Sequence, residues 1–181
     1  DWGIGLDTVS IQEIWIAKRA GFPPERILYT PNCVGTDEIE MAIQEGVQIN
    51  VDHIETLEYI GHHHPGTKVG IRINPHVMAG GHEKLSVGHI DSKFGISIYQ
   101  LPLVLRLVDA LKLRVNGLHM HTGSDILDSG VFRLAAEILF DAARKFSDLE
   151  FIDFGSGIKV AYKADDVYTD VEELGQVLSE S

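Results

Sequence analysis

The stretch VQINVDHIETLEYIGHHHPGTKVGIRINP, residues 47–75, carries the pattern that decides the fold. Two short apolar runs, 47–52 and 68–75, enclose a segment at 54–61 whose apolar residues recur at helical spacing. Val and Ile occupy both faces of the two runs, as they do in the buried strands of parallel sheets. The stretch therefore predicts a strand–helix–strand unit.

The same alternation extends toward both ends of the chain. Further apolar runs lie at 3–7, 26–30, 113–121 and 150–155, and further helical patterns lie at 11–21, 36–46, 96–112 and 130–146. Strands that alternate with helices in this way predict a parallel sheet with right-handed crossovers.

The spacing of the strands favours one of two parallel architectures. The first strands start near residues 3, 26, 47 and 68, and this even spacing favours a (β/α) barrel of the TIM type over an open doubly wound sheet. A complete eight-stranded barrel takes about 250 residues. Because only about six βα units are visible in residues 1–181, we expect an incomplete barrel.

Capping residues support the predicted helices. Ser10 followed by Glu13 is a capping-box pattern, which predicts a helix start. Gly46 and Gly61 stand where helices are expected to end. Asp170 opens one more predicted helix near the end of the chain.

Composition excludes several classes of protein. With 44% hydrophobic residues, 18 glycines and 6 prolines, the chain reads as globular. A net charge of −12 argues against nucleic acid or an anionic membrane as the main partner. No apolar run approaches the roughly 20 residues that a membrane-spanning helix needs. The single Cys33 excludes an internal disulfide and fits a reducing cytoplasm. The N-terminus lacks an initiator Met and a signal segment, so we expect a processed chain or a fragment.

Polar residues follow nearly every predicted strand. In chain order they are Asp7, Asn32, Asp52 with His53, Arg72 with Asn74, His119 with His121, and Asp153. In parallel α/β folds the carboxyl ends of the strands form the ligand-binding face. The pattern therefore predicts a shared active-site rim.

The segment GLHMHTGSD, residues 117–125, allows two interpretations of its paired histidines. His119 and His121 point to one face of a strand, because strand side chains alternate with period two. A metal pair, as in barrel metallohydrolases, needs further ligands from later strands, and Asp153 is the only obvious later candidate. In the second interpretation, a histidine packs against the ring of an aromatic cofactor. This arrangement needs no second ligand, only a phosphate site nearby.

A glycine-rich turn, FIDFGSG at 151–157, supplies such a phosphate site. Its glycines let backbone N–H groups approach an anion, and the Ser156 hydroxyl is a further donor. Gly123 and Ser124 offer a second donor loop after the neighbouring strand. The two loops favour a phosphate-bearing cofactor over a metal, and the metallohydrolase stays as an alternative.

The segments GLDTVSIQEIWIAKRAGF, VGIRINPH, GHIDSKFGIS, GLHMHTGSD and FIDFGSG occur in the order found in diaminopimelate decarboxylases. The chain resembles that family, one of the pyridoxal-phosphate enzymes with an alanine-racemase-like barrel, from about Gly3 to Tyr162. The segments RINP and HIDSKFG favour it over the ornithine and arginine decarboxylases of polyamine pathways.

The resemblance implies pyridoxal 5'-phosphate as the cofactor and assigns roles to six residues of this chain. His121 is similar to the histidine that stacks on the pyridine ring, and Ser124 to a serine near the phosphate. The phosphate loop corresponds to Gly155, Ser156 and Gly157, with Ser156 in place of the family's usual middle glycine. His89 falls where relatives place a group near the cofactor's phenolic oxygen.

Other expected parts of the enzyme lie outside the chain. The resemblance places the Schiff-base lysine upstream of Asp1, so no catalytic residue is identified here, and Lys93 is taken as structural. It places the C-terminal β-domain and the carboxylate partner of the pyridine nitrogen beyond Ser181. Residues 1–181 are thus expected to be the middle of the cofactor-binding barrel and inactive alone.

For the intact protein, the resemblance implies a cytoplasmic homodimer that converts meso-diaminopimelate to L-lysine. A polyamine-pathway decarboxylase and a non-catalytic relative that only binds the cofactor stay as alternatives.

Overall fold

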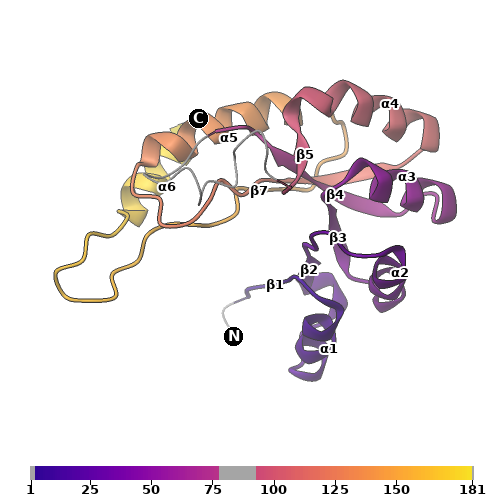
Figure 1. Cartoon of the computed structure of the whole chain (residues 1–181), viewed down its shortest axis with the longest axis horizontal. Helices are drawn as coiled ribbons and strands as arrows, with labels where there is room; N and C mark the ends of the chain where they lie inside the picture. The colour runs from indigo at the N-terminus through magenta and orange to yellow at the C-terminus, as the bar shows by residue number, and fades with distance from the viewer. Residues whose placement is uncertain (1–2, 78–92, 181) are drawn as a thin grey trace.

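The computed structural model describes residues 3–77 and 93–180 (Figure 1). Its strands are β1 (Leu6–Thr8), β2 (Ile27–Tyr29), β3 (Gln48–Val51), β4 (Lys68–Asn74), β5 (Ile96–Ser97), β6 (Arg114–His119) and β7 (Phe151–Asp153). Its helices are α1 (Ile11–Arg19), α2 (Thr36–Glu45), α3 (Ile54–His63), α4 (Leu101–Leu111), α5 (Ser129–Ala143) and α6 (Val171–Glu180).

The strands form a parallel sheet in the order β1-β2-β3-β4-β6-β7, and β5 pairs only with β4. Figure 1 shows α1 to α5 in an arc along one side of this sheet. Apolar side chains of alternate strand residues pack against these helices and are fully buried, as Val69 and Ile71 are. The residues between them face the other, concave side. The predicted incomplete parallel barrel is therefore confirmed.

Local signals in the sequence explain most helix ends. The Ser10 side chain accepts a hydrogen bond from the Glu13 N–H, and the Asp170 side chain accepts from the N–H groups of Glu172 and Glu173. Gly46 ends α2 with a left-handed φ of 73°, as predicted.

The predicted helix end at Gly61 is wrong. Gly61 lies buried inside α3, which continues to His63 and has His64 as its C-cap. A Cβ atom on Gly61 would come within 2.7 Å of the Leu111 side chain on α4. The glycine is therefore required by the close packing of α3 on α4 rather than by a turn.

Two glycines lie side by side at the centre of the concave side of the sheet. Gly70 on β4 pairs with Gly117 on β6, and the Phe151 ring from β7 covers Gly117. A Cβ atom on Gly117 would lie 2.1 Å from Phe151 Cζ. The two glycines thus leave space that the Phe151 ring fills over Gly117 and the Asn50 amide fills over Gly70.

A β-bulge at Asn116 sets the register of β6. Val69 pairs with Val115 and the next residue, Gly70, pairs with Gly117, so Asn116 is the extra residue. Bulges of this kind change which side chains face a given side of the sheet. Beyond the bulge, His119 pairs with Arg72.

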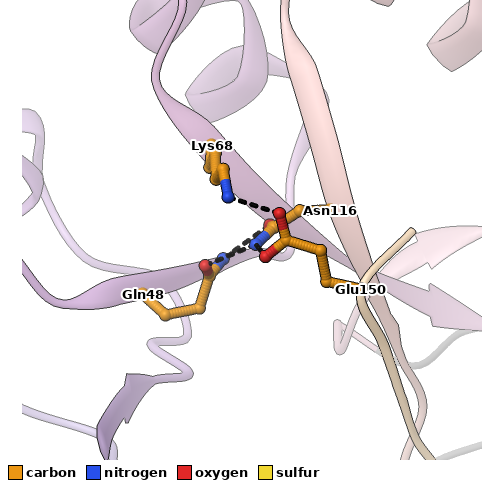
Figure 2. A network of polar contacts seen from close by, with 4 residues as sticks. All are labelled: Gln48, Lys68, Asn116 and Glu150. Carbon is orange, nitrogen blue, oxygen red and sulfur yellow. Dashed lines mark hydrogen bonds and ion pairs between the residues drawn. The ribbon is translucent and has the colours of Figure 1, made fainter. Parts of the chain in front are cut away.

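Figure 2 shows the polar contacts that hold this bulge at the amino ends of the strands. The side-chain amides of Asn116 and Gln48 exchange hydrogen bonds of 2.9 and 3.1 Å. Asn116 also donates to Glu150 Oε2 at 3.2 Å, and Lys68 forms an ion pair with the same carboxylate. The four side chains together tie β3, β4 and β6 to the start of β7.

Candidate functional site

A cavity of about 540 Å³ lies at the carboxyl ends of the strands. Its lining consists of Asp7, Val9, Thr30, Arg72, Phe94, His119, His121, Asp153, Gly155 and Ser156. The parallel sheet aligns the ends of β1, β2, β4, β6 and β7, which is why residues far apart in sequence meet here.

The structure brings five of the predicted rim residues to this cavity, namely Asp7, Arg72, His119, His121 and Asp153. Asn32, Asp52 and His53 instead form a separate group beside it. There, Asn32 donates to Asp52 Oδ2 at 2.8 Å, and His53 Nδ1 lies 2.9 Å from Asp52 Oδ1.

Arg72 is the cation of the cavity. Its side chain is 7% exposed, and its guanidinium lies 4.8 Å from the centre of the Phe94 ring. Burial lowers the pKa of Arg72, and the carboxylates of Asp52, Asp7 and Asp153 oppose that shift. A guanidinium remains charged under such conditions, so the cavity holds a buried positive charge among carboxylates.

His119 is a buried neutral imidazole. It is 4% exposed, and burial together with the nearby Arg72 lowers its pKa to about 3. Its Nε2 lies 3.9 Å from Asp153 Oδ2, which is too long for a hydrogen bond. Its Nδ1 is buried and has no hydrogen-bond partner among residues 3–77 and 93–180.

His121 is held in one orientation by the loop after β7. The Ser156 N–H donates to His121 Nδ1 at 3.4 Å, so the ring hydrogen is on Nε2. Burial and Arg72 lower the pKa of His121, while Asp153 opposes the shift. A neutral imidazole therefore faces the cavity beside the glycine-rich turn.

Two glycines of that turn are required by close approach to the loop after β6. Gly155 has φ 68°, and a Cβ atom there would lie 2.4 Å from the Met120 carbonyl oxygen. Gly157 has φ 112°, and a Cβ atom there would lie 1.8 Å from the Gly123 carbonyl oxygen. Ser156 between them does not have a positive φ. A side chain therefore replaces glycine at the one position of the turn where the backbone tolerates it.

The remaining predicted residues lie as follows. Asn74 is buried at the end of β4 and outside the cavity lining, and its side chain accepts a hydrogen bond from the His76 N–H at 2.9 Å. Ser124 is exposed and next to the glycine-rich turn, since its Cα lies 3.5 Å from where a Gly157 Cβ would be. His89 lies outside the described residues. The structure thus brings together His121, Ser124 and residues 155–157, and their predicted contacts with a cofactor stay predictions.

Three lining residues have no signal in the sequence that marks them as site residues. Thr30 and Val9 follow β2 and β1 directly, and Phe94 belongs to the SKFG segment. Lys93, its neighbour, is exposed, with Nζ 5.2 Å from the Phe94 ring centre. Among the described residues, no three His, Cys, Asp or Glu side chains are placed to hold a metal ion.

Comparison with known proteins agrees with this geometry. Residues 1–181 match the family model described as "Pyridoxal-dependent decarboxylase, pyridoxal binding domain". The chain is 40% identical over 183 residues to the diaminopimelate decarboxylase of Methanothermobacter thermautotrophicus, covering 98% of this chain and 43% of that protein.

Solved structures give the same result. A crystal structure of diaminopimelate decarboxylase superposes with a TM-score of 0.87 at 26% identity, covering 98% of this chain and 43% of that one. The Helicobacter pylori diaminopimelate decarboxylase complexed with L-lysine superposes with a TM-score of 0.82 at 29% identity, covering 97% and 47%. The chain therefore spans less than half the length of these relatives.

Proposed function

The chain belongs to the pyridoxal-dependent decarboxylase family, as its pyridoxal-binding domain, and on that premise we propose that the whole protein converts meso-diaminopimelate to L-lysine and carbon dioxide. Pyridoxal phosphate is the cofactor. The observation that supports the site most directly is the neutral His121 ring held by Ser156 at the edge of the cavity.

The residues of the cavity fit this cofactor. An uncharged imidazole can pack on a pyridine ring without losing the solvation of a charge. The phosphate would be held by the turn at 155–157 and by Ser124, where glycines allow the backbone to come close. Arg72 supplies the positive charge of a cavity that must accept an anionic ligand.

When bound, pyridoxal phosphate supplies an electron sink for the bond that breaks as carboxylate leaves. The residues of this chain bind and orient. His121 keeps its hydrogen on Nε2 because Nδ1 accepts from Ser156, and its lowered pKa favours the neutral ring. Arg72 suits a substrate carboxylate, and Asp7 with Asp153 suits a substrate ammonium group.

Substrate choice is tested with the full-length enzyme loaded with the cofactor. We expect carbon dioxide and L-lysine from meso-diaminopimelate, and at most slow turnover of ornithine or arginine. Release of carbon dioxide from ornithine alone would instead favour the polyamine-pathway alternative. The family match decides against the metallohydrolase.

Cofactor binding by this chain is tested separately, by equilibrium dialysis with pyridoxal phosphate. His121→Ala should weaken binding by tenfold or more, if ring packing contributes about 1.4 kcal/mol. His53→Ala is the matched control, because His53 also follows a strand but lies outside the cavity lining. Equal affinity of the two variants would contradict the assignment. Borohydride treatment should fix no cofactor on Lys93.

We also propose that the intact protein is a cytoplasmic homodimer, which the family resemblance supports. Within residues 3–77 and 93–180, no helix is long and apolar enough to cross a membrane. Analytical ultracentrifugation of the full-length protein tests the dimer. The Schiff-base lysine and the C-terminal β-domain stay predictions about that protein.

A further inference from the structure

A chain of hydrogen bonds crosses three strands beneath the cavity and ends on Asp7. The Asn50 amide of β3 donates to Thr30 Oγ1 at 3.1 Å, and Thr30 Oγ1 donates to Asp7 Oδ1 at 2.8 Å. Asn50 is 0% exposed and Thr30 is 5% exposed. The Thr30 N–H also donates to the Thr8 carbonyl, so its backbone is fixed beside β1.

The direction of this chain is determined by its members. A threonine hydroxyl has one hydrogen, and its oxygen accepts from the Asn50 amide. The remaining hydrogen therefore points at Asp7, whose oxygen must accept it. A donated hydrogen bond stabilises an ionised carboxylate more than a neutral carboxylic acid, so the hydrogen-bond chain favours the charged form of Asp7.

Other groups around Asp7 shift its pKa, some upward and some downward. Asp7 is open to the cavity, yet the protein around it removes enough water to raise its pKa. The Thr30 hydrogen bond opposes that shift, Asp153 from β7 adds to it, and Arg72 from β4 weakly opposes it. Thr30 is thus the strongest influence in favour of the ionised carboxylate.

We propose that Thr30 is a positioning residue of the site, whose hydroxyl, oriented by Asn50, aims the ionised Asp7 carboxylate into the cavity to hold a protonated amine. That the ligand held by Asp7 is a substrate amine rests on the proposed decarboxylase function. The orientation of Asp7 by Thr30 does not, because it follows from contacts within this chain.

The test is the carboxyl titration of Asp7 by carbon-13 NMR in this chain. Thr30→Val keeps the shape of the side chain and removes the hydroxyl, and it should raise the Asp7 pKa by about one unit. Thr30→Ser retains the hydroxyl and should restore the parent value. Should the valine variant not fold, Thr30→Ala carries the same test in a smaller side chain. An Asp7 pKa that is unchanged in a folded variant without the hydroxyl overturns the proposal.

The full-length enzyme separates this proposal from the proposed function. There, the acidic limb of the kcat/KM profile for diaminopimelate should move to higher pH in Thr30→Val and return in Thr30→Ser. A shifted Asp7 titration in an enzyme without activity on diaminopimelate would retain the positioning role and reject the substrate. An unshifted pH profile in an active Thr30→Val enzyme would overturn the role of Asp7 in turnover.

Discussion

Replacing Gly157 with alanine should destabilise the chain far more than an ordinary glycine replacement. At φ 112° an L-residue is strained, at a cost of about 1–3 kcal/mol. The new Cβ would also lie 1.8 Å from the Gly123 carbonyl oxygen, whereas real Cβ contacts essentially never fall below 3.0 Å. The two loops must then separate by more than an ångström, which breaks the packing beside His121. We expect a total loss of about 3–4 kcal/mol.

Urea denaturation measures this loss, and Gly21→Ala is the matched control. Gly21 has a similar φ of 94°, but a Cβ atom there would meet nothing within 4 Å. It therefore reports the backbone strain alone, about 1 kcal/mol. Thermal unfolding should show a drop in Tm of about 10 °C for Gly157→Ala, given roughly 2–4 °C per kcal/mol. Equal losses for the two variants would show that the loops are not in close approach.

Three further changes test other parts of the structure. Because the pKa of His119 is about 3, against about 6.5 for an ordinary histidine, the unfolded chain takes up more protons between these values. Stability should therefore fall as pH decreases through that window, and His119→Asn should flatten the dependence in urea titrations at several pH values. Asn116→Leu should cost about 1–3 kcal/mol, because Gln48 Oε1 loses the Asn116 donor, whereas Lys68→Met should cost less, because the ion pair that it removes is exposed. Gly117→Ala should cost about 1–3 kcal/mol through contact with Phe151, and Phe151→Leu in the same chain should recover part of it; additive losses would contradict the contact.

The fold could be predicted from the sequence where a residue pattern has only one structural explanation. The central strands β3, β4 and β6 are buried on both faces, and this burial produces apolar runs separated by segments of helical spacing, so the parallel sheet followed directly. The glycine at position 61 has two possible causes, a helix end or a close helix contact, and only the packing against Leu111 distinguishes them. The short β5 was missed because Ile96 and Ser97 precede a helix and pair with β4 over two residues.

The site was predictable where a polar residue interrupts an apolar strand. Asp7, Arg72 and His119 all stand out in that way. Thr30 does not, because threonine is an ordinary strand residue and its hydroxyl gains importance only beside Asp7. The reason for the glycines in the turn at 155–157 was also hidden, since the carbonyls they approach belong to a different loop.

At the bulge in β6, replacing Asn116 and deleting it should have different effects. Leu113 and Val115 are buried before it and Leu118 and Met120 after it, so the spacing of these buried apolar residues changes from two to three across Asn116. Deleting Asn116 should restore the regular alternation of side chains along β6 and leave His119 opposite Arg72. Replacing Asn116 keeps the extra residue but removes the side-chain contacts that hold it in place. A chain shortened by this one residue should therefore keep His119 and His121 on the cavity side.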